Sequence, residues 1–210
     1  MIAADQAALQ AATAQREAER RNLQALLDQR TAERTRTLQN QVDERAAAGK
    51  LADEAADLRA LIQGLDGAAN PLDAPPDGTR PFSESRGRLP LPVRGTVIQN
   101  FGERDALGLA AQGITIATLA DAAIVAPYDG RIVFAGPFRS YGQLLIIAHG
   151  GGYHTLIAGL SRIDGQVGQW LLAGEPVAQA SHGENGKSAV YVELRRNGEP
   201  INPGPWLAAR

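Results

Sequence analysis

The sequence predicts a mixed fold, in which an N-terminal α-helical coiled-coil arm is followed by an all-β domain. The first third of the chain consists mainly of Ala, Gln, Glu, Arg and Leu, and it has no aromatic residue and no proline before Pro71. A proline-rich stretch comes next, and short β-forming runs separated by glycine-rich turns follow it. We therefore expect a helical arm over 1–65, a linker over 66–90 and a β domain over 91–210.

The arm is predicted from its strong helix formers and its apolar spacing. Leu51, Ala55, Leu58, Ile62 and Leu65 recur at alternating spacings of four and three, which is typical of a coiled-coil seam. A helix this long needs a partner helix from the same chain or another, because an isolated helix is only marginally stable in water. Two roles stay open for the arm: a docking lever, or a spacer and dimerisation stalk.

The linker is predicted from its turn and breaker residues, such as Asn70-Pro71, Pro75-Pro76 and Asp77-Gly78. A stretch of this length without periodicity is unusual inside a compact domain, so we interpret it as a connector between two units. Phe82 is its single aromatic residue and the large apolar anchor that we expect there. Phe82 either packs on the domain that follows or is exposed.

The β domain is predicted from many short runs of β-forming residues with glycine-rich breaks between them. The expected strands lie at 96–100, 113–117, 124–126, 131–135, 144–148, 153–158, 176–180 and 189–196. The last run alternates strictly, so its two faces differ. One face carries Val190, Val192 and Leu194, and the other carries Ala189, Tyr191, Glu193 and Arg195. A lone strand of this kind is usually an edge strand with one solvated face.

Composition excludes several classes of protein. The 210 residues are 44% hydrophobic with a net charge of −2, so no basic excess points to nucleic acid. No apolar run is long enough to span a bilayer. The start, Met-Ile-Ala-Ala-Asp, lacks the features of a signal peptide, so we expect a cytoplasmic chain or a processed or trimmed piece of an exported protein. The absence of cysteine excludes disulfides and suits an oxidising compartment.

Many short motifs of the β region agree in order and spacing with one family. They are residues 100–104, 112–117, 126–136, 141–142, 149–153, 168–169, 173–176, 191–195, 197–198, 202–203 and 205–207. Together they resemble the LytM/lysostaphin-type peptidoglycan peptidase domain over about 115 residues. The resemblance implies a β domain with a cleft.

The resemblance also shows what this chain lacks. Active members of that family bind zinc through a His-x-x-x-Asp pair and the second His of a His-x-His motif, and they use the first His of that motif and a further upstream His in catalysis. Carried over by register, these positions are Ala111, Thr115, Ala189, Tyr191 and Gly159. A catalytic zinc needs about three N, O or S ligands from the protein. We therefore expect no metal, no cofactor and no catalytic residue.

The remaining histidines and serines do not form another site. His149, His154 and His182 have spacings that fit no metal motif, and a lone histidine is usually structural or exposed. Ser161 and Ser188 lack the sequence context of a catalytic nucleophile.

A cleft without its metal leaves a binding surface. We expect the surface to be lined by groove residues from several strands: Thr115, Tyr141, Leu144, Tyr191 and Arg195. Tyr and Arg are among the residues most enriched at binding hot spots. Truncating Tyr191 or Arg195 is therefore expected to impair binding more than folding. The alternative is a groove that is decaying after loss of activity.

A helical arm, a linker and a metal-free LytM-like domain together resemble the EnvC-type murein hydrolase activators. The resemblance implies a non-catalytic periplasmic protein that activates zinc-dependent N-acetylmuramoyl-L-alanine amidases and so promotes peptidoglycan splitting at cell division. It also implies that the arm docks on the FtsE–FtsX complex and that a helix can cover the groove. Two other functions stay open: a residual peptidoglycan endopeptidase and a non-catalytic peptidoglycan-binding module.

Overall fold

The structure is a computed structural model that describes residues 2–67, 80–104, 108–183 and 186–208. Side chains in the first helix are described from residue 15 on, except at 18, 44, 48, 51 and 65–67. The chain divides into two compact units, Met1–Leu51 and Ala52–Arg210. In the described part of the chain, no helix has both the length and the apolar character needed to cross a membrane.

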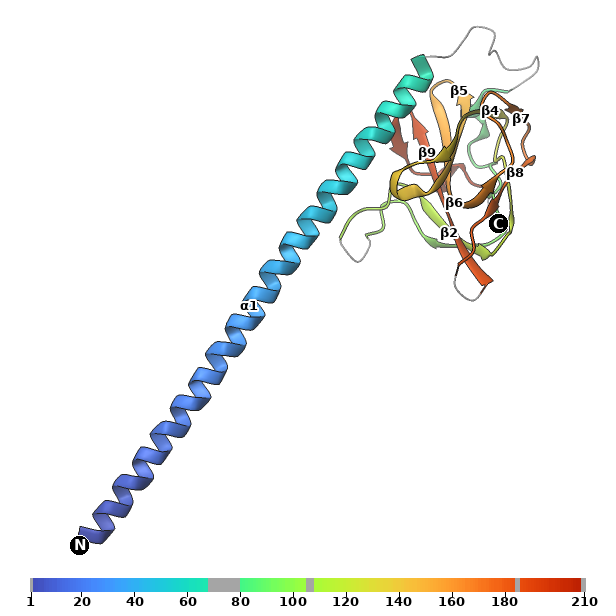
Figure 1. The fold of residues 1–210 in the computed structure, drawn as a ribbon. Helices are drawn as coiled ribbons and strands as arrows, with labels where there is room; N and C mark the ends of the chain where they lie inside the picture. The colour runs from blue at the N-terminus through green and yellow to red at the C-terminus, as the bar shows by residue number, and fades with distance from the viewer. Residues whose placement is uncertain (1, 68–79, 105–107, 184–185, 209–210) are drawn as a thin grey trace. The chain divides into compact units, whose positions relative to one another are not determined.

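A single helix, α1 (Ile2–Gly67), forms the N-terminal part of the chain (Figure 1). In the first unit its described large apolar side chains stay open to solvent, with Leu23, Leu27 and Val42 at 52–59% exposure. Polar side chains four residues apart bond along the surface, as Gln24 does to Asp28. The predicted helical arm is thus confirmed as a helix, while its boundary at residue 65 stays a prediction.

The β domain is confirmed, and the described residues form one sheet of short strands. The strands are β1 (Thr96–Gln99), β2 (Ile114–Leu119), β3 (Ala123–Val125), β4 (Gly130–Pro137), β5 (Gln143–Gly150), β6 (Tyr153–Ile163), β7 (Trp170–Leu171), β8 (Pro176–Ala180), β9 (Lys187–Arg196) and β10 (Glu199–Ile201). Their order is β1-β2-β9-β6-β5-β4-β7, with β10 beside β9 and β8 between β3 and β6. The strands that pair along this path are antiparallel. Because β9 lies between β2 and β6 in this order, it is an interior strand of the sheet.

The two faces of β9 lie in different clusters, as the alternation predicts. Val190 and Val192 belong to the main core, together with Ile114, Ile116 and residues of β4, β5, β6 and β8. Tyr191 packs on the other face, against a second cluster described below.

Phe82 packs on the β domain, which decides between the two alternatives. It lies in the short 3₁₀ helix η2 (Phe82–Ser85) and is 2% exposed. Its ring stacks on His149 and Trp206, with centroid distances of 4.6 and 5.1 Å. The end of the predicted linker is therefore anchored in an aromatic cluster, whereas residues 68–79 lie outside the described part.

Candidate partner-binding groove

The predicted groove residues come mainly from one row that crosses four neighbouring strands. Thr115 of β2 lies directly opposite Tyr191 of β9, Tyr191 lies opposite Ala158 of β6, and Ala158 lies opposite Leu144 of β5. We call these four residues the groove row. Tyr141 adds to it from the turn before β5, since its ring centroid is 6.0 Å from that of Tyr191. The structure thus brings Thr115, Tyr141, Leu144 and Tyr191 together.

Arg195 lies further along β9, and it is committed to partners within the chain. It is 1% exposed, and its Nε donates to Glu193 Oε1 at 2.6 Å. Its Nη1 donates to the carbonyl of Gly198 at 2.9 Å, while Nη2 is buried without a hydrogen-bond partner among the described residues. The free guanidinium expected at the groove is therefore a buried structural group in this conformation.

Glu193 is the centre of this polar network and was missing from the predicted site. It is fully buried, and it accepts a hydrogen bond from the Tyr191 hydroxyl at 3.0 Å as well as the one from Arg195. Burial raises the pKa of the Glu193 carboxyl, and the Arg195 guanidinium opposes that rise. The signal was present in the row of a phenol, a carboxylate and a guanidinium along one strand face.

Both groove tyrosines are held in the protonated form. Burial, followed by the charge of Glu193, raises the pKa of Tyr141 to about 12. The same two causes raise the pKa of Tyr191 well above its ordinary value. Each phenol is therefore a hydrogen-bond donor with an apolar ring, and neither supplies a phenolate at neutral pH.

The residues at the zinc positions do not fit a metal ion. Ala111 has no side-chain donor atom, and the Thr115 hydroxyl donates to Gln99 Oε1 at 3.1 Å. The Tyr191 hydroxyl is neutral and bonded to Glu193. A zinc site needs about three deprotonated or neutral N, O or S ligands. In the described residues, no three His, Asp or Glu side chains are grouped so as to hold a metal.

The position of the upstream catalytic histidine has also lost the space for a side chain. Gly159 has a φ of +82°, a conformation that L-residues rarely adopt. A Cβ atom at Gly159 would lie 2.3 Å from the carbonyl oxygen of Ala189. A histidine at this position would therefore require the backbone to move.

The three histidines lie in separate environments. His149 Nδ1 donates to the carbonyl of Asp129 at 2.8 Å, because a carbonyl can only accept, and its Nε2 then accepts from the Thr155 hydroxyl at 2.8 Å. Burial lowers the pKa of His149 to about 4. His154 is buried on β6 opposite Arg195, and His182 pairs with Asp121 at the surface.

The last turns of α1 cover the apolar side of the groove row. We call residues 52–64 the covering segment. Leu58 and Ile62 are fully buried in one cluster with Leu144, Ile146 and Leu156. Since Leu58 and Ile62 are four residues apart, they share one face of the helix. This part of the predicted seam packs on the chain's own sheet, a surface that the heptad pattern did not reveal.

Polar contacts hold the covering segment on both sides. Asp57 pairs with Arg139, and Glu54 accepts a hydrogen bond from Ser140, both at the turn before β5. On the other side, Arg59 Nη2 donates to Glu199 Oε2 at 3.2 Å, and Arg59 Nε lies 3.0 Å from Glu199 Oε1 in the same ion pair. These pairs are exposed, so each adds only about 0–1 kcal/mol, and the buried apolar pair supplies most of the closure.

The β domain is similar in sequence to known proteins. Residues 110–203 match Peptidase family M23. The chain is 33% identical over 123 residues to the murein hydrolase activator EnvC of Escherichia coli (strain K12), a match that covers 58% of this chain and 29% of that protein. It is 34% identical over 120 residues to the murein hydrolase activator NlpD of Salmonella typhimurium, which covers 57% of this chain and 31% of that protein.

A solved structure shows the same fold. A putative peptidase M23 from Pseudomonas aeruginosa matches with a TM-score of 0.50 at 23% identity, covering 60% of this chain and 52% of that chain. The two relatives from Escherichia coli and Salmonella typhimurium are named as activators, and the matched part of the chain spans about a third of their length.

Proposed function

We propose that the protein, whose residues 110–203 match Peptidase family M23, is a non-catalytic activator of zinc-dependent N-acetylmuramoyl-L-alanine amidases. One observation carries this proposal. The groove row replaces the family's zinc ligands with an apolar and aromatic surface, in which Tyr191 is fixed by the buried pair of Glu193 and Arg195. The curated relatives, named murein hydrolase activators, support the same class of function.

The groove suits a protein partner better than a reacting peptide. It offers apolar side chains at Leu144 and Ala158, two neutral phenols, and no group with the donor set of a metallopeptidase. Aromatic rings with a polar tip are frequent hot spots of protein interfaces. Activation requires only that the groove bind the active form of the amidase better than the inactive form, and a difference of about 1.4 kcal/mol shifts that equilibrium tenfold.

The covering segment would regulate this activity, because it occupies the surface that the amidase needs. Burying Leu58 and Ile62 contributes roughly 1.5–3 kcal/mol each, so closure is worth a few kcal/mol. A partner that needs the surface around Leu144 must displace the segment first, which lowers its apparent affinity. We place the protein in the periplasm, where it promotes peptidoglycan splitting at cell division, and we assign docking on the FtsE–FtsX complex to the helical arm.

An assay on dye-labelled murein tests the proposal. The purified chain is added to a zinc amidase of the same cell envelope, and dye release is compared with that of each protein alone. We expect faster release only when both are present, and retention of the amidase by the immobilised chain. Release by the chain alone would instead indicate a residual endopeptidase. Retention on murein without any effect on the amidase would indicate a peptidoglycan-binding module.

A further inference from the structure

A second surface lies at the edge of the sheet, at strand β1, which is the neighbour of β2. Strand β1 ends the strand order, and it pairs only with β2 in the described part of the chain. Its four residues, Thr-Val-Ile-Gln, include no charge and no proline, the features that usually protect an edge strand. Ile98 stands at an irregularity of the pairing and is 60% exposed.

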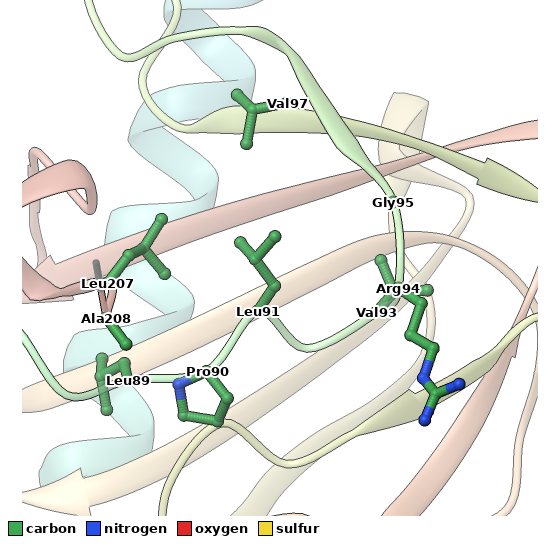
Figure 2. Close-up of a pocket in the computed structure, with 9 residues that line it drawn as sticks. All are labelled: Leu89, Pro90, Leu91, Val93, Arg94, Gly95, Val97, Leu207 and Ala208. Atoms are coloured by element: carbon green, nitrogen blue, oxygen red, sulfur yellow. The ribbon is translucent and has the colours of Figure 1, made fainter. Parts of the chain in front are cut away.

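An apolar pocket of about 560 Å³ adjoins this edge (Figure 2). Its walls come from the segment before β1, from β1 itself and from the C-terminal segment. Its lining includes Leu89, Leu91, Arg94, Val97, Leu207 and Ala208. Figure 2 shows Leu91, Val97 and Leu207 pointing into the same space, while the Arg94 guanidinium points away from it. A ligand with an apolar side chain next to a carboxylate could therefore bury the apolar side chain in the pocket and pair the carboxylate with Arg94.

The segment leading into β1 is strongly basic, although the whole chain has a net charge of −2. Residues 80–94 contain four arginines and one glutamate, a net charge of +3. Arg86, Arg88 and Arg94 are exposed, and none has an ion pair with an acidic side chain among the described residues. This charge favours an acidic ligand.

From the open edge, the pocket and the charge, we propose that β1 binds an extended acidic segment of a partner protein as an added strand. The segment would hydrogen-bond to the outward backbone groups of Thr96–Gln99 and place one apolar side chain between Val97 and Leu207. Its carboxylates would lie beside Arg94 and the basic segment. A strand is favoured over an anionic amphiphile because the pocket continues into unpaired backbone donors and acceptors.

Two matched peptides probe the site on the full chain. One is dye-labelled Glu-Thr-Val-Thr-Leu-Thr-Glu, and the other has lysine in place of both glutamates. Fluorescence anisotropy measures binding, and amide hydrogen exchange reports protection of residues 96–99. We expect the acidic peptide to bind and to protect these amides. Ile98→Glu and Arg94→Glu should each weaken its binding tenfold or more, because each places a carboxylate beside the peptide's own carboxylates, and Arg94→Glu should strengthen binding of the lysine peptide.

Val167→Glu is the matched control, because Val167 is 63% exposed but does not line the pocket. It should bind the acidic peptide as the unmodified chain does, and circular dichroism verifies that every variant is folded. Equal binding of both peptides, or unchanged binding by Ile98→Glu, overturns the proposal. So does self-association of the chain that Ile98→Glu abolishes, since a second copy would then occupy the edge.

Discussion

At the scale of single residues, the site is organised around Tyr191, the tyrosine that we predict to lie at the position of a zinc ligand in active LytM-type peptidases. Its hydroxyl donates a hydrogen bond to the buried Glu193 carboxylate, and its ring packs against the apolar cluster that includes Leu144 and Ala158. Tyr191 is therefore held in one orientation before any partner arrives. Preorganised side chains lose less entropy on binding, which favours affinity.

Replacing Tyr191 tests whether the groove binds the amidase. Tyr191→Ala should weaken binding by about 1–2 kcal/mol or more, because a hot-spot ring is lost. Tyr191→Phe is the matched variant, since it keeps the ring and removes only the bond to Glu193. It should retain more of the binding energy. A titration with the amidase, together with a thermal melt, makes the measurement. Full binding and activation by a normally folded Tyr191→Ala chain would remove this residue from the interface.

The burial of Arg195 reverses what its sequence position predicts. Truncation was expected to spare folding, but Arg195→Ala would leave Glu193 fully buried without its cation. Breaking a buried pair in this way costs about 3–5 kcal/mol of stability. The double variant Glu193→Leu with Arg195→Met should recover much of that loss. Urea denaturation measures the free energy of unfolding of the single variant, the double variant and the unmodified chain. A single variant as stable as the unmodified chain would contradict the structural role.

His149 gives the stability a defined pH dependence. Its pKa is lowered to about 4 in the folded chain, whereas an unfolded histidine titrates near 6.5. Between these two values the unfolded state binds a proton that the folded state does not, so stability falls as the pH drops from 6.5 to 4. The expected loss is about 3 kcal/mol. Denaturant midpoints measured across this range, for the chain and for His149→Asn, test it, and the variant should show a flatter dependence.

At the scale of elements, the alternation along 189–196 predicted both faces of β9 because a strand has a fixed period of two. Short elements gave no such signal: β7 has two residues and β10 has three. The apolar spacing of the helix predicted a seam, but spacing does not say which surface the seam meets. Leu58 and Ile62 fit a partner helix and a sheet equally well. Similarly, the burial of Arg195 depends on Glu193 and on the hairpin at Gly198, which the sequence does not place.

Releasing the covering segment should raise activation. Leu58→Glu with Ile62→Glu places two charges in the apolar cluster and should open the groove, because burying an unpaired charge costs more than closure contributes. The concentration that gives half-maximal amidase activation should then fall tenfold or more. Leu23→Glu with Leu27→Glu is the control, since both side chains are exposed on the same helix. Identical activation by the two double variants would show that the segment does not regulate the groove.

At the scale of the whole molecule, the chain has the fold of an M23 peptidase, and no three His, Asp or Glu side chains of its described residues are grouped so as to hold a metal. Its histidines serve other purposes: His149 supports Phe82 and the aromatic cluster, and His182 pairs with Asp121. The position of the catalytic histidine, Gly159, has no room for a side chain. Recovering peptidase activity would therefore take backbone rearrangement as well as new ligands.

The purified chain should accordingly bind no stoichiometric zinc and cut no peptidoglycan alone. The expected zinc ligand is missing at Ala111, and the neutral Thr115 and Tyr191 hydroxyls are engaged in hydrogen bonds to Gln99 and Glu193. Added zinc should leave the melting temperature unchanged, because a metal that does not bind the folded state cannot stabilise it. A chelator should likewise have no effect. Elemental analysis, thermal melts and murein digestion measure these properties. One zinc per chain together with chelator-sensitive cleavage would show that other residues bind the metal and that the protein is a zinc-dependent peptidase.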